Sequence, residues 1–334
     1  MRVLVTGGTG LVGSHVLKAL VRENKHEIIA IRRKTSAMHL VEQFEDQIEW
    51  HDCDIVDLIK LKDVTKDINI VIHAAAYISL NSKDKQQLYN INAEGTANVV
   101  NCCIVNQVEQ LIYVSSTAVL GGARGRLIHE DDHWVDKPLK LTYAHSKYLG
   151  EQEVWRGAAE GLSVNIVAPS LVVGAGFWHS APALISQMDK GIKSYPTGSY
   201  GVVDARDVAS MILSLIEISK PNQKYICSAE NLTLKELCNL IAQSLNKPPV
   251  SRPLEGIYFR LILLLSTINY WFPFNKDLSK DHLIISNQEI RFDNQKSIND
   301  LNFTFRKVSQ TVQDTVMAYK QSMERNSPYA YPLD

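Results

Sequence analysis

RVLVTGGTGLVG, residues 2–13, joins a compact apolar run directly to glycines spaced G-x-x-G-x-x-G, and a helical pattern then runs to Arg22. A run of this kind, followed at once by a turn and a helix, is typical of a buried parallel strand. Gly7 would allow a tight turn, Gly10 would let the backbone approach a pyrophosphate, and Gly13 would let the helix pack closely on the sheet. The helix N-terminus would then hold the phosphates. The turn residues predicted to contact a nucleotide are Gly7, Thr9, Gly10, Leu11, Val12 and Gly13.

The spacing of this turn differs from the G-x-G-x-x-G of the standard dinucleotide fingerprint, so the strand–turn–helix setting carries the prediction. An ordinary glycine turn between a strand and a helix is the alternative.

The next apolar run, residues 27–31, is followed by the basic residues Arg32, Arg33 and Lys34. A dinucleotide fold usually has an acid at this point, which binds the adenosine ribose hydroxyls. The guanidinium of Arg32 would instead pair with a 2′-phosphate through a forked, charge-assisted contact. The sequence therefore favours NADP over NAD as cofactor, and a solvated basic loop is the alternative.

Tyr143 and Lys147 are four residues apart, so on a helix they share one face. A free tyrosine has a pKa of about 10, and a nearby cation lowers that value. Tyr143 could then act as a general acid or base. The surrounding residues follow a helical pattern, although Gly150 weakens it locally. A solvated helix face is the alternative for this pair.

A further buried-looking run, residues 111–114, ends in Ser115, Ser116 and Thr117. Ligands of open parallel sheets bind beyond the carboxyl ends of the strands. Ser116, or Thr117 in its place, could therefore hydrogen-bond a substrate oxygen opposite Tyr143, and the alternative is that these hydroxyls only cap a loop. Together the turn, the hydroxyls and the tyrosine–lysine pair predict hydride transfer at a carbonyl or an alcohol.

These motifs, in this order, resemble the extended short-chain dehydrogenase/reductases of the NAD-dependent epimerase/dehydratase superfamily, in the dihydroflavonol-4-reductase-like branch. The resemblance spans nearly the whole chain. The segments that carry it are 6–13, Asp54-Ile55, 71–76, 92–96, 114–121 and the Tyr143/Lys147 pair.

The resemblance implies a role for each matching residue. Ser116 would orient the carbonyl, Tyr143 would donate the proton, and Lys147 would lower the tyrosine pKa and hold the nicotinamide ribose. Asn92 would support the cofactor pocket, with a helix-surface amide as the alternative. The further cofactor-binding residues implied are Asp54, Ile55, Ala74, Ala75, Ala76 and Pro169.

Segment 168–176 resembles the family segment that covers the nicotinamide. Ala168 stands where many sugar epimerases have arginine, and Ala175 stands where proline is usual. Both departures disfavour a nucleotide-sugar substrate.

The predicted fold is α/β, a doubly wound parallel sheet (Rossmann fold) with a smaller C-terminal substrate-binding region. We expect residues 1–170 to form the dinucleotide-binding domain, with contributions from about 202–228, and residues 171–334 to form mainly the substrate-binding and lid region. The aromatic residues proposed for the pocket wall are Tyr77, Phe177, Trp178 and Tyr195, each of which could equally be core.

The apolar stretch 257–274 is interrupted by Arg260 and is too short to span a bilayer, which needs about 20 apolar residues. A lid over an apolar substrate, a patch at a membrane surface and an ordinary buried helix all stay open for it.

The composition agrees with a single soluble enzyme of this kind. The 334 residues, 45% of them hydrophobic, can bury a large core, and the net charge of −1 gives no electrostatic reason to expect nucleic acid as a partner. The five cysteines have no metal-ligand spacing and the start has no signal-peptide pattern, so we expect no metal and a cytoplasmic location. The resemblance suggests a homodimer through residues 92–103 and 143–155.

The sequence thus predicts an NADP-dependent oxidoreductase that reduces a ketone or aldehyde to an alcohol, or catalyses the reverse, on a small and fairly apolar substrate. A nucleotide-sugar or sugar 4-epimerase or dehydratase with tightly bound NAD is the alternative enzyme. A non-catalytic NADP-binding regulator is the alternative from another class.

Overall fold

The structure of the protein is a computed structural model. It describes residues 1–79, 81–121, 126–132, 141–178, 183–218, 220–256, 259–260, 263 and 286–334.

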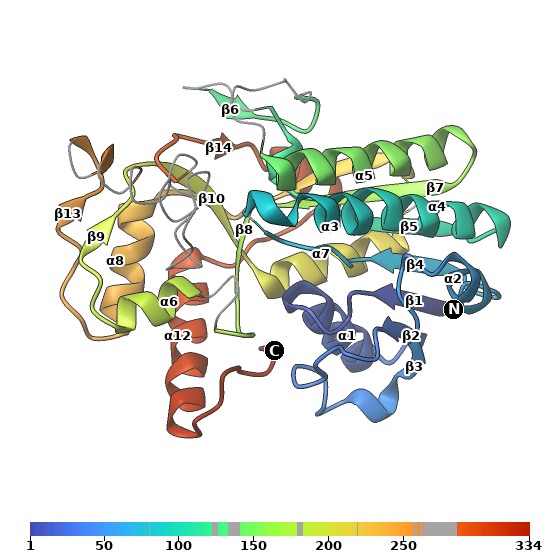
Figure 1. Cartoon of the computed structure of the whole chain (residues 1–334), viewed down its shortest axis with the longest axis horizontal. Coiled ribbons are helices and arrows are strands. Elements are labelled where there is room, and N and C mark those ends of the chain that lie inside the picture. Colours follow the sequence, from blue (N-terminus) through green and yellow to red (C-terminus); the bar gives the residue numbers. More distant parts are fainter. Residues whose placement is uncertain are drawn as a thin grey trace.

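A seven-stranded sheet with every neighbouring pair parallel forms the centre of the molecule (Figure 1). The strand order is β11-β7-β5-β4-β1-β2-β3. The strand bounds are β1 Arg2–Thr6, β2 Glu27–Arg32, β3 Glu49–Asp52, β4 Ile70–His73, β5 Gln110–Val114, β7 Ser163–Pro169 and β11 Gln223–Cys227. The order reverses between β1 and β4, and a parallel sheet binds its ligands in the crevice beside such a reversal. The predicted doubly wound α/β fold is confirmed.

Helices cover both faces of this sheet (Figure 1). On one face α1 (Leu11–Glu23) packs against α7 (Ala205–Glu217), and their apolar sides form one core cluster with the sheet. The opposite face is covered by α2 Leu58–Val64, α4 Thr96–Val105 and α5 Thr142–Ala159, which enclose a second cluster. The central strands β1, β4 and β5 are almost continuously apolar, as expected where both faces of a sheet are covered.

The C-terminal region forms a third core cluster, at one end of the sheet (Figure 1). Its small sheet has the order β12-β10-β8, in which β10 is parallel to β8 and antiparallel to β12. A capping box at Thr233 and Glu236 starts α8, because the side chain of each residue accepts a hydrogen bond from the backbone N–H of the other. The elements here are β8 Leu171–Val173, α6 Ala183–Asp189, β10 Ser199–Asp204, β12 Glu230–Thr233, α8 Leu234–Ser244 and α12 Val308–Glu324.

Short elements complete the described part of the chain. Two parallel pairs join distant segments, β9 with β13 and β6 with β14. Their bounds, with those of the two remaining helices, are α3 Lys85–Tyr89, β6 Leu127–Ile128, β9 Ser194–Tyr195, β13 Arg252–Pro253, β14 Arg291–Phe292 and α11 Gln295–Leu301.

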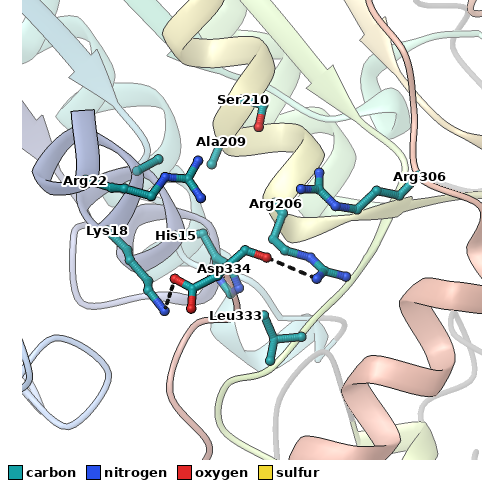
Figure 2. A pocket seen from close by; sticks show the side chains of 10 residues that line it. His15, Lys18, Arg22, Arg206, Ala209, Ser210, Arg306, Leu333 and Asp334 are labelled. Atoms are coloured by element: carbon teal, nitrogen blue, oxygen red, sulfur yellow. Dashed lines mark hydrogen bonds and ion pairs between the residues drawn. The ribbon is translucent and has the colours of Figure 1, made fainter.

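The C-terminal segment, residues 327–334, returns to the half of the molecule that contains the seven-stranded sheet and ends beside α1 (Figure 1). Lys18 Nζ bonds the Pro332 carbonyl oxygen and pairs with the Asp334 carboxylate, both at 2.8 Å. The Arg206 guanidinium donates to the Asp334 backbone oxygen at 3.2 Å (Figure 2). The segment therefore closes a small pocket between α1 and α7 and links the two parts of the molecule.

Most of the apolar stretch 257–274 lies outside the described residues, so the three interpretations of it stay predictions. None of the helices within the described ranges combines the length and the apolar character that crossing a bilayer requires.

Candidate active site

The glycine turn after β1 is tightly folded. Gly7 has φ +72°, which a side chain rarely adopts, and its carbonyl accepts from Gly10 N–H at 3.0 Å. A Cβ at Gly13 would lie 2.1 Å from that same carbonyl oxygen, so α1 could not approach the turn with any larger residue. The first turn of α1, which lies wholly within the described residues, carries no acidic side chain and no side-chain cap, and the N–H groups of a first turn have no partner within the helix. The turn therefore permits the close approach of α1, and no carboxylate in the first turn of α1 would repel an anion.

A buried histidine joins this turn to the end of β4. His73 Nδ1 lies 2.6 Å from Thr6 Oγ1, and its Nε2 lies 3.1 Å from Thr96 Oγ1. Burial lowers the pKa of His73 to about 3, so the ring is neutral. Thr6 Oγ1 also accepts from Ala75 N–H at 3.2 Å. His73 is thus a structural residue that fixes segment 74–76 along the crevice.

Arg32 lies at the end of β2 and is partly neutralised. Its Nε donates to Asp52 Oδ1 at 3.2 Å, and its guanidinium lies 5.8 Å from the Trp50 ring centre. The sequence directly after β2 has no acidic residue, but Asp52 of the neighbouring strand β3 places a carboxylate at this point. The register of β2 and β3 pairs Arg32 with Asp52, and no local motif in the sequence signals that pairing.

Asp54 and Ile55 follow β3 and are held in place by their own contacts. Asp54 Oδ1 accepts from Val56 N–H at 3.2 Å, and the Ile55 carbonyl accepts from Asn98 at 3.1 Å. Ile55 is buried against Gly95. These contacts fix the short segment that follows β3.

Ser116 and Tyr143 meet in a hydroxyl pair. Ser116 follows β5 and its Oγ accepts from Ala118 N–H at 3.2 Å, while Tyr143 lies in the first turn of α5. Burial raises the pKa of Tyr143 to about 12, and a hydrogen bond with the Ser116 side chain opposes that rise. The structure thus brings together Ser116 and Tyr143, the two residues that the sequence analysis predicts to contact one substrate oxygen.

Lys147 lies one helical turn further along α5 and is almost completely buried. Its Nζ donates to the Val114 carbonyl at 2.8 Å and lies 4.3 Å from the Tyr113 ring centre. Burial lowers the pKa of Lys147 to about 7, against the opposing effect of Glu151. The predicted lowering of the Tyr143 pKa by Lys147 is not found in this geometry. The ammonium is directed to the β5 backbone because a buried cation needs an acceptor.

Asn92 is completely buried in a π-helical turn, residues 90–95, so the helix-surface alternative is wrong. Its Oδ1 accepts from Tyr77 N–H at 2.8 Å, and its Nδ2 donates to the Tyr77 carbonyl and to Ser146 Oγ, both at 2.9 Å. Asn92 therefore ties the loop after β4 to the helix that carries Tyr143. Such π-helical turns are frequent at functional sites.

Gly150 lets α5 lie this close. A Cβ there would be 2.1 Å from the Asn92 carbonyl oxygen and 2.9 Å from the Tyr113 hydroxyl. The glycine that weakens the helical pattern in the sequence is thus the point of closest contact between α5 and its neighbours.

Thr117 makes a different contact from Ser116. Its Oγ1 lies 3.3 Å from the Tyr200 hydroxyl, and the Tyr200 ring meets Phe292 edge-on at 5.3 Å. Tyr200 also adds to the rise in the Tyr143 pKa, so the two phenols are electrostatic neighbours. Sequence reasoning missed Tyr200, because β10 is distant in the chain and no motif surrounds this residue.

The segment after β7 returns toward the glycine turn. Pro169, the last residue of β7, is buried and pairs with Cys227 of β11. Ala175 is buried, and a Cβ at Gly176 would lie 2.9 Å from the Leu11 side chain. The segment therefore passes directly over the start of α1.

The four aromatic residues predicted for the pocket wall have different surroundings. Tyr77 is held by Asn92, and its hydroxyl donates to Asp84 at 3.4 Å. Trp178 is 5% exposed and its Nε1 donates to Ser322 Oγ at 2.7 Å, so it belongs to the C-terminal core. Phe177 packs edge-on to Tyr329 at 5.9 Å, and Tyr195 lies under Lys235 at 5.4 Å.

The described residues contain no group of three His, Cys, Asp or Glu side chains arranged to hold a metal ion.

Comparison with known proteins agrees with this architecture. The model of the "NAD dependent epimerase/dehydratase family" matches residues 3–227. A putative dihydroflavonol 4-reductase of Synechocystis sp. is 26% identical over 325 residues, which cover 93% of this chain and 92% of the relative. Sterol demethylase protein B of Methylococcus capsulatus is 25% identical over 270 residues, 78% of this chain and 79% of that protein.

Among solved structures, the crystal structure of gox2253 superposes with a TM-score of 0.82 at 27% identity, and covers 96% of this chain and 98% of that one. The family model matches more than half of the chain and includes the glycine turn, Ser116, Tyr143 and Lys147. The chain therefore belongs to the NAD-dependent epimerase/dehydratase family.

Proposed function

We propose that this protein is an NADP-dependent oxidoreductase that interconverts a ketone or aldehyde and the corresponding alcohol. The observation that carries the proposal is the proximity of the Ser116 and Tyr143 hydroxyls just beyond the carboxyl end of β5, where the buried Lys147 donates to the Val114 carbonyl. A serine and a tyrosine hydroxyl that meet at the ligand end of a parallel sheet can bind and protonate one oxygen atom.

The cradle formed by the glycine turn fits a dinucleotide, since no Cβ fills it and α1 directs its N–H groups there. Residues 7–13 would hold the pyrophosphate, Asp54 and Ile55 the adenine, and Lys147 the nicotinamide ribose. Segment 74–76 and Pro169 would line the remaining walls. When bound, the cofactor supplies or accepts the hydride.

The chain's own residues would handle the oxygen and the proton. Ser116 would donate a hydrogen bond to the carbonyl oxygen, and Tyr143 would transfer its hydroxyl proton to that oxygen as the hydride reaches the carbon. With a pKa of about 12, Tyr143 is protonated at neutral pH and ready to act as an acid. In the reverse direction the same group would accept the proton from the alcohol. The balance is one carbonyl, one hydride and one proton, which give one alcohol.

For the cofactor we propose NADP, because Arg32 is the last residue of β2, where the adenosine ribose would end. The pairing of Arg32 with Asp52 leaves the guanidinium one free side for a 2′-phosphate.

The substrate we propose is small and fairly apolar. The Thr117–Tyr200 contact adjoins an apolar cluster that includes Val119, Leu120 and Phe292. A dihydroflavonol and a sterol appear in the names of two relatives.

An NAD-dependent sugar 4-epimerase or dehydratase is the second candidate. Asp52 favours it, because a carboxylate at the end of β3 could bind the ribose hydroxyls of NAD. Ala168 and Ala175 disfavour a nucleotide sugar. The intact hydroxyl pair disfavours a non-catalytic regulator, which has no use for a buried proton donor.

We also propose a reducing, cytoplasmic location. All five cysteines are free and buried, and burial raises the pKa of Cys53 to about 11, so none is poised to form a disulfide.

Titration of the purified protein with NADPH and NADH, followed by a panel of ketones and aldehydes, tests the proposal. We expect tighter binding of NADPH and net oxidation of NADPH by at least one carbonyl compound. Tight NADH binding with sugar interconversion and no net oxidation would support the epimerase instead. Cofactor binding with no turnover of any compound would support the non-catalytic NADP-binding regulator.

A further inference from the structure

A buried carboxylate lies one helical turn beyond Lys147. Glu151 of α5 is 2% exposed, although burying an unpaired carboxylate is costly. Ser115 Oγ donates to its Oε2 at 2.6 Å, and Trp155 Nε1 donates to its Oε1 at 3.4 Å. Lys224 of β11 forms an ion pair with the same Oε1. Glu151 is thus fully engaged by groups from three elements.

Ser115 connects Glu151 with the residues of the candidate active site. Ser115 is the residue directly before Ser116, and directly after Val114, whose carbonyl accepts from Lys147. By accepting a hydrogen bond from Ser115, Glu151 fixes the backbone between Val114, whose carbonyl binds Lys147, and Ser116. Tyr143, Lys147 and Glu151 also lie at successive spacings of four residues, on one face of α5.

Among the charged groups near Lys147, Glu151 is the one that stabilises its ammonium form. Burial keeps His73 neutral, and it raises the pKa of Tyr113 far above the ordinary value, so this phenol is neutral too. Lys224 is a second cation at the same carboxylate. The titratable groups that interact with Lys147 are Glu151 of α5, His73 of β4 and Tyr113 of β5. Tyr143 lies one turn before Lys147 on α5, and Lys224 of β11 reaches Glu151.

We propose that Glu151 is a positioning residue of the active site: it holds Lys147 as an ammonium ion and fixes the β5 turn that carries Ser116, and Lys224 moderates its charge. The catalytic meaning of this assignment rests on the proposed oxidoreductase function. The electrostatic part can be measured without any turnover.

The first test is a titration of Lys147 by NMR in protein labelled with ¹³C-lysine, in which the missing signal of a Lys147→Arg variant assigns the resonance. Glu151→Gln keeps the size of the side chain and an oxygen that accepts from Ser115, but removes the charge. We expect the Lys147 midpoint, near 7 in the native protein, to fall by about one pH unit. Lys224→Met removes the competing cation, so we expect the midpoint to rise.

The opposite directions separate the proposal from simple structural damage, which would move both variants the same way. Glu153→Gln, on the partly exposed side of the same helix, is the matched control and should leave the midpoint in place. An unchanged midpoint in Glu151→Gln, or a fall in Lys224→Met, would overturn the proposal. Where Glu151→Gln does not fold, the direction of the Lys224→Met shift decides.

The second test follows the pH dependence of carbonyl reduction. If the ammonium form of Lys147 is the active one, kcat falls as the pH rises through its pKa, and that limb should move to lower pH in Glu151→Gln and to higher pH in Lys224→Met. A fixed limb in both variants, together with native turnover, would contradict the positioning role. Absence of turnover in the native protein would refute the proposed function, and the NMR result would still decide the role of Glu151 toward Lys147.

Discussion

At the scale of single residues, burial sets the protonation state of the groups around the candidate proton donor. It raises the pKa of Tyr143 to about 12 and lowers the pKa of Lys147 to about 7 and that of His73 to about 3. At neutral pH the tyrosine is therefore an acid, the histidine is neutral, and the lysine is close to its midpoint. Small changes in charge nearby should act mainly through Lys147.

Arg32 is the residue at which cofactor choice can be tested. Arg32→Ala removes the guanidinium and leaves Asp52 unpaired, and its carboxylate would then repel a 2′-phosphate and accept ribose hydroxyls. We expect NADPH affinity to fall by a factor of about 10 to 100, as loss of a charge-assisted contact worth about 1.5–3 kcal/mol implies, and NADH affinity to hold or rise. Calorimetric titration with both cofactors measures the ratio.

Arg33→Ala is the control for this prediction, because Arg33 is exposed and adjacent. An unchanged NADPH to NADH ratio in Arg32→Ala, or a larger change in the control, would show that Arg32 does not read the 2′-phosphate.

The residues that sequence could identify are those with a local signature. Gly7 and Gly13 belong to one turn, and Tyr143 and Lys147 belong to one helix. Asp52 and Tyr200 reach the same region only through strand register and through a second sheet. Their positions in the chain do not indicate that they belong to the candidate site. Glu151 is an intermediate case, because extending the four-residue spacing of Tyr143 and Lys147 by one more step reaches it.

At the scale of elements, α5 is the scaffold of the candidate active site, and its depth in the molecule depends on Gly150. The helix lies against the π-helical turn of Asn92 and against Tyr113 of β5. Sequence alone interprets Gly150 as a weak point of the helix, because propensity describes an isolated helix and takes no account of close packing. The distances reverse that interpretation.

Gly150→Ala should therefore destabilise the protein although alanine favours helices. The gain in propensity is at most about 1 kcal/mol, and the new Cβ would lie 2.1 Å from the Asn92 carbonyl oxygen. Forced displacement in a packed interior costs about 1–3 kcal/mol. We expect a lower free energy of unfolding in urea, and reduced turnover because Tyr143 moves with the helix. Glu153→Ala on the same helix is the control and should change stability by less than about 0.5 kcal/mol. Equal or greater stability of Gly150→Ala would be incompatible with the packing described.

At the scale of the whole molecule, the chain's last residues connect its two parts. Tyr329 stacks on His39 at 4.9 Å and meets Phe177 at 5.9 Å, while the hydroxyls of Tyr329 and Tyr331 both bond Glu42. The loop after β2, the segment after β8 and the C-terminal segment thus meet in one aromatic cluster beside the seven-stranded sheet.

Tyr329→Ala should loosen this junction without touching Tyr143 or Ser116. Loss of two aromatic contacts is worth about 1–3 kcal/mol, so we expect faster amide hydrogen exchange in residues 36–44 and weaker NADPH binding. Met323→Ala removes a side chain that is 40% exposed on α12 and should leave both properties unchanged. Unaltered exchange in Tyr329→Ala would show that the cluster does not hold the loop.

The whole-molecule level is also where sequence-based prediction is weakest. The regular alternation of strands and helices made the doubly wound sheet predictable, because apolar strands and glycine turns are local signals. The C-terminal half has no such repetition, and its core joins segments far apart in the chain. An aromatic residue such as Trp178 therefore could not be assigned to pocket or core until the contact with Ser322 was known.

The most direct test of the proposed chemistry is a comparison of the native protein with Tyr143→Phe, which removes only the hydroxyl. NADPH oxidation by an accepted ketone and NADPH affinity should be measured on the same preparations. The account predicts that kcat falls by about 10²–10⁴-fold, the range typical of a lost general acid, while NADPH affinity is retained. Undiminished turnover in Tyr143→Phe would show that this phenol is not the proton donor.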